Sequence, residues 1–104
     1  MRKLHWESIK SSPEYKKITS KGRKIITPFF IIFSIPADET KLGIIASKRV
    51  GSAVERNRVK RILRNAFSEA KISMKSAVLI AKSSVLEADY QDILKCIKKS
   101  MGKD

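Results

Sequence analysis

The feature of this 104-residue sequence that most constrains its fold is one long amphipathic helix, predicted over residues 53–71. Ser52 and Glu55 have the spacing of a capping box, in which each side chain bonds the backbone N–H of the other residue at a helix N-terminus. At about 100° per residue, the apolar positions form one continuous arc of this helix. The arc contains Val59, Ile62, Leu63, Ala66, Phe67 and Ala70. The helix is about 28 Å long, and we expect its apolar arc to be buried and its opposite face to be exposed.

The opposite face of the same helix is almost entirely cationic. Its members are Arg56, Asn57, Arg58, Lys60, Arg61 and Arg64, with Lys48 and Arg49 just before the helix. Guanidinium groups bond phosphate oxygens through two parallel N–H groups, and an asparagine among them can bond a base edge, a ribose or a hydrated metal ion. The alternative is a solvated charged face, which is the usual role of charged helix residues. The single sign of these charges, without acidic residues four positions away, favours phosphate binding.

The net charge of the chain is +13, and two segments carry nearly all of it. Residues 1–24 contain eight Lys and Arg against two Glu, and residues 48–64 contain seven against one, so each segment has a net charge of +6. Such a domain attracts nucleic acids and anionic membranes. No apolar run approaches the length of a membrane span, the N-terminus lacks the apolar stretch of a secretory signal, and the single Cys96 fits a reducing compartment. We therefore expect a cytoplasmic nucleic-acid-binding protein that does not bind membranes.

Local signals predict a first helix and an extended segment in the N-terminal third of the chain. Ser12 is suited to the N-cap of the helix, Pro13 to its first position, and Gly22 to the position after its end. Residues 24–35 are expected to be extended, with Pro28 interrupting or bounding the first part of the segment.

The remaining strands and the last helix complete the expected fold. Residues 42–47 form another predicted strand. A turn at residues 36–39 precedes it, so we expect this strand to form a hairpin with the extended segment before the turn. Residues 77–82 form a short strand. The last helix has Tyr90, Ile93, Leu94, Ile97 and Met101 at helical spacing. The order helix, two or three strands, helix, strand, helix predicts an α+β fold in one domain of residues 1–104, with helices packed on a single sheet.

No group of residues in the sequence suits catalysis by the protein itself. The only histidine, His5, is near the N-terminus, where a solvated side chain is expected. Cys96 has no second cysteine or histidine at ligand spacing, which favours a structural thiol. Asp38 and Glu39 are neighbours in a turn, and the four glycines form no phosphate-binding loop. The sequence therefore predicts a binding protein that cleaves no bond unaided.

A second candidate surface is the sheet face opposite the long helix. A sheet that helices cover on one face only leaves its other face open to unstacked bases. Alternation along the strand places Phe30 and Ile32 in the core. A cleft on the other face would contain Tyr15, Phe29, Ile31 and Phe33. The alternative is that Phe33 and Tyr15 only pack together.

The segment LGIIASKRVGSAVERNRVKRILR, residues 42–64, resembles the signature of the bacterial ribonuclease P protein family. That signature is a strand that ends in Ser-Lys-Lys/Arg-Val-Gly, a turn of small residues, and a helix with Arg-Asn-Arg and then Lys-Arg one turn later. Pro-Glu-Tyr at residues 13–15, followed by Gly22, resembles the first helix of the family. The last strand and helix follow in the family's order, so the resemblance covers essentially the whole chain.

The resemblance implies the fold αβββαβα, with a mixed four-stranded sheet and a left-handed β-α-β crossover, although such crossovers are nearly always right-handed. It also implies the protein subunit of a ribonucleoprotein that removes the 5′ leader from precursor tRNA. The Mg²⁺-dependent hydrolysis would be performed by the RNA subunit, so that the holoenzyme is the nuclease and the protein alone is inactive. No metal site on the protein is inferred.

The resemblance also implies residue roles at the positions that match the family. The contacts with the catalytic RNA would be made by Lys48, Arg49, Arg56, Asn57, Arg58, Lys60, Arg61 and Arg64. The leader of precursor tRNA would lie in a cleft formed by Tyr15, Ile31 and Phe33. Thr19 departs from the family, in which an aromatic residue is common at this position, and the difference implies weaker stacking of the leader.

Two other classes of function remain open. A ribosomal protein would use the same basic helix on ribosomal RNA without a catalytic partner. A DNA-binding protein would insert the helix into a major groove, but no compact helix-turn-helix is predicted, so no DNA partner is expected. Cleavage of precursor tRNA at low Mg²⁺, after the protein is added to a bacterial ribonuclease P RNA, discriminates between these classes.

Overall fold

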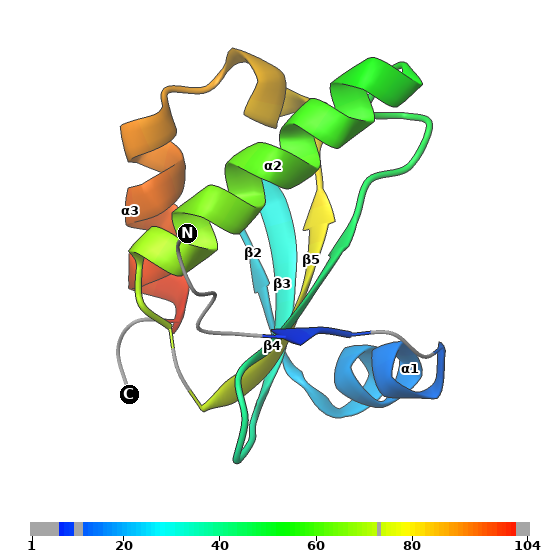
Figure 1. Ribbon diagram of the computed structural model, residues 1–104, viewed down its shortest axis with the longest axis vertical. Helices are drawn as coiled ribbons and strands as arrows, with labels where there is room; N and C mark the ends of the chain where they lie inside the picture. The colour runs from blue at the N-terminus through cyan, green and yellow to red at the C-terminus, as the bar shows by residue number, and fades with distance from the viewer. Residues whose placement is uncertain (1–6, 10–11, 73, 102–104) are drawn as a thin grey trace.

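The computed structural model describes residues 7–9, 12–72 and 74–101, and they form a single sheet with helices on both faces (Figure 1). The elements in chain order are β1 (Glu7–Ser8), α1 (Ser12–Lys21), β2 (Arg23–Ile26), β3 (Phe30–Pro36), β4 (Lys41–Ile45), α2 (Ala53–Glu69), β5 (Lys75–Ala81), the 3₁₀-helix η1 (Ser83–Glu87) and α3 (Tyr90–Met101). The predicted order of helices and strands is confirmed, with β1 and η1 as additions.

The sheet has the strand order β1-β4-β5-β3-β2 and mixes parallel and antiparallel pairing. β1, β4 and β5 run parallel to each other, whereas β3 is antiparallel to both β5 and β2. The mixed sheet implied by the family resemblance is therefore confirmed. Strands β2 to β5 are its four main strands, and the two-residue β1 extends its edge.

The predicted hairpin between β3 and β4 is wrong, because β5 lies between these two strands. Ile80 of β5 pairs with Ile31 on one side and with Ile45 on the other. β5 is buried along most of its length, as is typical of a central strand that is covered on both faces. The hairpin of this sheet is β2–β3, where the Thr27 hydroxyl donates to the Phe30 carbonyl oxygen (2.7 Å) and accepts from the Phe30 N–H (3.0 Å).

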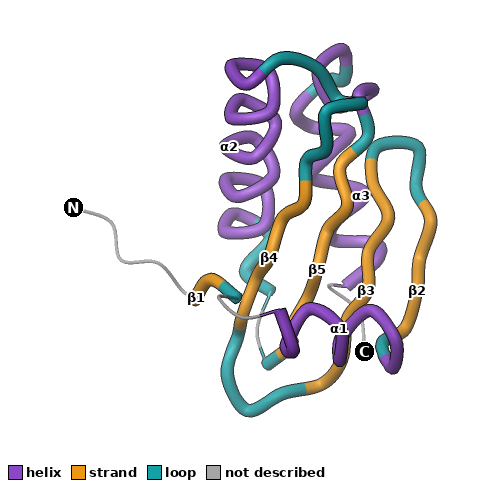
Figure 2. The backbone as a smooth tube through the Cα atoms, turned by 90° about the vertical axis from the view of Figure 1, so that its right-hand side faces the viewer, coloured by secondary structure: helices purple, strands orange, loops and turns teal. Residues whose placement is uncertain are grey.

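The connection from β4 through α2 to β5 is left-handed. With α1 toward the viewer, as in Figure 2, the chain rises along β4, descends through α2 and rises again along β5, which lies to the right of β4. Figure 1 shows from the side that α1 lies on one side of the sheet, and α2 packs on the opposite face. A crossover of this kind is contrary to the usual preference and agrees with what the family resemblance implied.

Two apolar clusters lie on opposite faces of the sheet. The larger cluster is under α2 and α3, and its fully buried side chains include Phe30, Ile32, Leu63, Phe67, Leu79, Ile93 and Ile97. The smaller cluster is under α1 and contains Ile9, Ile18 and Val78, with Tyr15, Phe33, Ile35 and Ile80 packed against them. The expectation that helices cover one face only is therefore wrong. The central strand β5 carries apolar side chains on both faces, so the second face also needs a cover.

The N-terminus of α2 has the predicted capping box. The Ser52 hydroxyl accepts from the Glu55 N–H (3.3 Å), and the Glu55 carboxylate accepts from the Ser52 N–H (2.9 Å). Gly51 has a φ of +151°, and a Cβ atom there would collide with the Glu55 carboxylate. Glycine is therefore required beside this cap. The buried residues of α2 are Val59, Leu63, Ala66 and Phe67, all of which belong to the predicted apolar arc.

We expect Leu63→Ala to lower the free energy of unfolding by about 2–5 kcal/mol, because it leaves a cavity in the larger cluster. Leu63 has no exposed surface, whereas Val54 on the same helix is 77% exposed. Val54→Ala is the matched control and should change the free energy of unfolding by no more than about 0.5 kcal/mol. Denaturant unfolding measures both values, and similar values for the two variants would contradict this assignment of faces.

Candidate nucleic-acid interface

The exposed side of α2 carries five cations and one asparagine, which we call the cationic face. It consists of Arg56, Asn57, Arg58, Lys60, Arg61 and Arg64. Arg56 and Lys60 are partly buried, and the other four residues are exposed. Since Arg56, Lys60 and Arg64 are four residues apart, they follow one side of α2 at intervals of about 6 Å. Lys48 and Arg49 are exposed in the turn that precedes α2, so the eight predicted RNA contacts belong to one continuous segment.

The two acidic residues of α2 are occupied by structural hydrogen bonds. Glu55 belongs to the capping box, and the Glu69 carboxylate accepts from the Tyr90 hydroxyl of α3 (2.7 Å). In the described parts of the chain, no cation of the cationic face is in an ion pair, and the ion pair that is found joins Lys41 to Glu14 (3.0 Å). The charges of the cationic face are therefore not compensated within the fold, which suits a polyanionic partner.

Tyr15 of α1 lies directly on β4 at Gly43. A Cβ atom at Gly43 would be 2.5 Å from the hydroxyl oxygen of Tyr15 and 2.7 and 2.8 Å from two of its ring carbons. Only glycine leaves room for the ring at this point of the sheet. The sequence reasoning missed Gly43, although a glycine inside a strand often marks such a close approach.

A small cavity of about 200 Å³ joins α1 to the cationic face. Its lining residues are Ile9, Tyr15, Leu42, Gly43, Ile44, Lys60 and Arg64. The fold therefore brings Tyr15, a predicted contact of the leader, beside two predicted contacts of the catalytic RNA. No local sequence pattern relates these positions, because they are far apart in the chain.

Phe33 and Ile31 lie on the α1 face of the sheet, as predicted. Phe33 and Tyr15 pack against the same buried cluster, and both are only partly buried. The Lys24 ammonium group, on the neighbouring strand, is 5.8 Å from the centroid of the Phe33 ring. Phe33 and Tyr15 therefore pack against the same cluster and still expose part of their rings to solvent.

The prediction that Phe29 lies on the same face is wrong. Phe29 packs against the larger cluster under α2 and α3. It precedes β3 and belongs to the turn, where its N–H donates to the Thr27 hydroxyl (3.2 Å). Alternation of side chains applies only inside a strand, so it does not place a residue of the turn.

The part of this face that α1 leaves open carries an apolar strip, which we call the isoleucine row. Ile45, Ile80, Ile31 and Ile26 are successive partners in the register of β4, β5, β3 and β2. Ile26 is 65% exposed and Ile45 is 39% exposed. Figure 2 shows α1 crossing the sheet near one end of the strands, away from this row. Contiguous exposed apolar surface of this kind marks an interaction site.

Other candidate chemistry is sparse in the described residues. Burial raises the pKa of the Cys96 thiol, and the nearby Asp92 carboxylate raises it further, so the thiol stays protonated at neutral pH. No group of three His, Cys, Asp or Glu residues in residues 7–9, 12–72 and 74–101 could hold a metal ion. No helix in the same residues is long and apolar enough to span a membrane. His5 lies outside the described residues.

Comparisons with known proteins agree on one family. The family model described as Ribonuclease P matches residues 5–103. The ribonuclease P protein component of a Nitratiruptor species is 34% identical over 89 residues, which cover 84% of this chain and 82% of the relative. The corresponding protein of Bacillus cereus is 32% identical over 103 residues, which cover 93% of this chain and 88% of the relative.

Solved structures show the same likeness. A Staphylococcus aureus RNase P protein mutant with defective mRNA degradation activity superposes with a TM-score of 0.80 at 28% identity, over 89% of this chain and 86% of that one. The RNase P protein of Thermotoga maritima superposes with a TM-score of 0.79 at 18% identity, over 91% of this chain and 94% of that one, which is a likeness of fold.

The mixed sheet, the left-handed crossover and the cationic helix define a small α+β protein of the bacterial RNase P protein type. This chain belongs to the ribonuclease P protein family. Membership implies an RNA partner within a bacterial ribonucleoprotein.

We expect Gly43→Ala to lower the free energy of unfolding by about 1–3 kcal/mol, because the added methyl group meets the Tyr15 ring. In a Tyr15→Ala background the same substitution should cost much less, since the ring is gone. Denaturant unfolding of the wild type, the two single variants and the double variant gives the coupling free energy between positions 43 and 15. An equal cost in both backgrounds would show that the ring does not lie on Gly43.

Proposed function

We propose that this chain is the cytoplasmic protein subunit of a ribonuclease P holoenzyme, in which it binds the catalytic RNA and the 5′ leader of precursor tRNA and so promotes 5′ maturation. The observation that carries the proposal is the cationic face of α2, whose five cations have no ion pair within the described residues. Membership of the family supports the choice of the catalytic RNA as the partner.

The cationic face suits the backbone of a folded RNA. Arg58, Arg61 and Arg64 are exposed and offer planar guanidinium groups to phosphate oxygens. Asn57, exposed among them, offers both a donor and an acceptor to a base edge or a ribose hydroxyl. Because the backbone of α2 is held by its buried arc, these side chains are presented by a rigid element. Binding then needs little rearrangement of the protein.

The α1 face suits single-stranded RNA. Unpaired bases can stack on Phe33 and Tyr15 and lie against the isoleucine row, while Lys24 near the Phe33 ring offers a charge to the backbone. The cavity that Tyr15 shares with Lys60 and Arg64 connects this surface to the cationic face. A single-stranded leader bound to the α1 face would therefore meet the catalytic RNA beside α2.

The chemistry is proposed to reside in the RNA subunit with Mg²⁺. The described residues offer no set of carboxylate, histidine or cysteine ligands for the ion, so no step is assigned to a metal on the protein. The role of the chain is to bind and position the two RNA molecules.

The first test of the proposal is reconstitution with a bacterial ribonuclease P RNA. Wild-type protein should restore cleavage of precursor tRNA at low Mg²⁺, and the protein alone should cleave nothing. The triple variant Arg58→Ala, Arg61→Ala, Arg64→Ala should bind the catalytic RNA more weakly. The slope of log K against log salt concentration should also become less steep, by about 0.7–0.9 for each phosphate that the variant no longer binds. Binding titrations at several salt concentrations measure this slope.

The matched control removes three exposed cations from α3 instead, as Lys95→Ala, Lys98→Ala, Lys99→Ala. It has the same net charge as the first variant and should keep nearly the wild-type salt dependence. Equal losses in both triple variants would show that net charge alone drives binding, and the cationic face would then have no specific role. Circular dichroism melts of both variants should match the wild type, since all six side chains are exposed.

The second test concerns the leader. Phe33→Ala should weaken binding of precursor tRNA by the holoenzyme by about 1–3 kcal/mol, which is the range for one base stacked on an aromatic ring. Binding of mature tRNA, which has no leader, should hardly change, and shortening the leader to one nucleotide should abolish the effect. If Phe33 serves only the packing under α1, the variant melts at a lower temperature and loses affinity equally for both RNA molecules.

A further inference from the structure

The strand β2 forms a free edge of the sheet. Among the described residues β2 pairs with β3 alone, and Figure 2 shows it as the last strand on its side of the sheet. Three of its four residues, Arg23, Lys24 and Ile26, are exposed. An open edge presents unpaired main-chain donors and acceptors, to which another extended chain can add as a further strand.

The pairing of β2 with β3 shows which main-chain groups point outward. The Thr27 N–H donates to the Phe30 carbonyl oxygen (2.9 Å), so these two residues form a hydrogen-bonded pair. Hydrogen-bonded and non-hydrogen-bonded pairs alternate along an antiparallel ladder. The N–H and C=O groups of Lys24 and Ile26 therefore point away from β3. No hydrogen bond between described residues engages them, so they are available to a strand outside the sheet.

A groove of about 540 Å³ lies beside this edge, between β2 and α3. Ile25 and Pro28 supply apolar surface on the strand side, and Cys96 and Lys99 line the groove from α3. Ile25 is half-buried and is the strand partner of the core residue Ile32, so its side chain lies on the face that α3 covers. A strand added to β2 would therefore direct every second side chain toward this groove.

The charged residues that line the groove are both cations. Among the described residues its lining contains Arg23 and Lys99 and no acidic residue, and Lys24 is exposed on the same edge. Cations on an edge strand are a usual protection against pairing between like chains, and a second copy of this chain, with a net charge of +13, is repelled. A strand that carries carboxylates opposite these cations is attracted instead.

The groove suits a polypeptide better than RNA, although its cations attract both. Its described lining has no aromatic ring on which a base could stack. The outward donors and acceptors of Lys24 and Ile26 recur at every second residue, which is the repeat of another β-strand. A polypeptide offers both donors and acceptors at that repeat, whereas the phosphates of RNA only accept hydrogen bonds.

We propose that β2 and this groove bind an extended acidic segment of a partner protein, which adds to the sheet antiparallel to β2. The segment would carry two apolar residues opposite Ile26 and Ile25. Two acidic residues would follow them, opposite Lys24 and Arg23. The acid opposite Arg23 would lie on the α3 side of the sheet, where Lys99 lines the groove. The inference goes beyond the proposed function, because the occupant is a protein.

The test uses the full chain and a fluorescent peptide of sequence Thr-Val-Ile-Glu-Glu-Thr, whose binding is followed by anisotropy. A peptide with lysines in place of both glutamates should bind at least about tenfold more weakly, because like charges then meet across the strands. The variant Arg23→Glu with Lys99→Glu should reverse this preference. The matched variant Lys16→Glu with Lys71→Glu changes exposed cations elsewhere and should keep it. Since all four side chains are exposed, both variants should unfold at the denaturant concentration of the wild type.

Main-chain methylation of the peptide distinguishes strand addition from simple charge attraction. In the proposed register, the N–H groups of the valine and the first glutamate donate to β2, whereas those of the isoleucine and the second glutamate point to solvent. N-methylation of the first pair should weaken binding about tenfold, through the loss of two hydrogen bonds. N-methylation of the second pair should not. Bound peptide should also slow the alkylation of Cys96, the only cysteine of the chain, because this thiol lines the groove.

Three results would overturn the inference. They are no binding of the acidic peptide, equal affinity of the acidic and lysine peptides, and equal effects of the two N-methylated pairs. If oligouridylate binds instead, and loses affinity in the Arg23→Glu, Lys99→Glu variant, the groove is an RNA contact and holds no protein strand. The contacts proposed for the cationic face do not depend on any of these results.

Discussion

The burial of one arc of α2 against the sheet is the interaction on which the rest of the structure depends. Val59, Leu63 and Phe67 have no exposed surface and belong to the same cluster as Phe30 and Leu79 of the sheet. Each such side chain contributes about 1.5–3 kcal/mol when fully buried. This burial fixes the rotation of α2 about its axis, so the cations on the opposite face must point to solvent. The same contacts that stabilise the fold therefore also orient the proposed RNA-binding surface.

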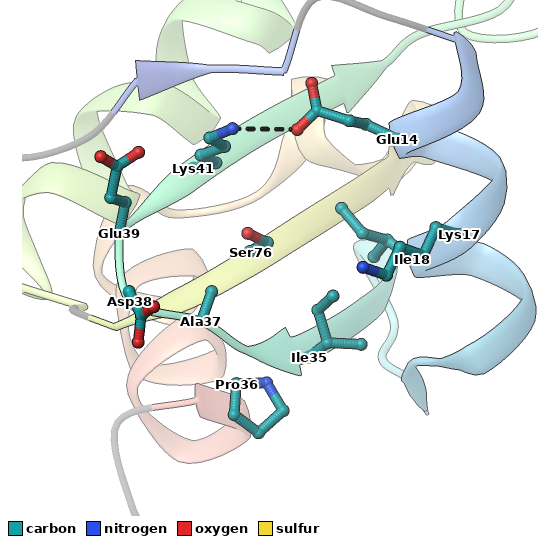
Figure 3. Close-up of a pocket in the computed structure, with 10 residues that line it drawn as sticks. All are labelled: Glu14, Lys17, Ile18, Ile35, Pro36, Ala37, Asp38, Glu39, Lys41 and Ser76. Carbon is teal, nitrogen blue, oxygen red and sulfur yellow. Dashed lines mark hydrogen bonds and ion pairs between the residues drawn. The ribbon is translucent and has the colours of Figure 1, made fainter.

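The second organising contact is the crossing of α1 over the other face of the sheet. Tyr15 lies on Gly43, and Ile18 is buried in the smaller cluster with Val78, so α1 covers that face around Gly43 and Val78. The isoleucine row stays open on one side of α1, and a cavity lined by Ser76 and Lys41 lies on the other side (Figure 3). A helix of ten residues thus divides one sheet face into two surfaces of different chemistry.

The two sides of the sheet also differ in charge, since α2 presents mainly cations and the residues near α1 are of mixed sign. The acids of α2 are taken up by the capping box and by the bond of Glu69 to Tyr90, which leaves the cations of that helix available to phosphates. The acids near α1 gather with lysines around a cavity whose net charge is small. In the proposed complex, the backbone of the catalytic RNA would meet α2, while unpaired bases of the leader would meet the α1 face. Strongly charged and nearly neutral surfaces of one small domain would then bind different parts of the RNA.

The sequence by itself determined the features whose causes are local. The capping box, the buried arc of α2 and its cationic face depend on residues three or four positions apart, and the structure confirms where each of them lies. The order of helices and strands also followed from the residues, with two or three strands before α2, but the full αβββαβα order and the left-handed crossover came only from the likeness to a family. Only the tertiary structure decided the rest: β5 lies between β3 and β4, Phe29 packs on the opposite face from its predicted one, and Tyr15 shares a cavity with Lys60. These arrangements depend on hydrogen bonds and packing between segments that are distant in the chain, which no local pattern of residues encodes.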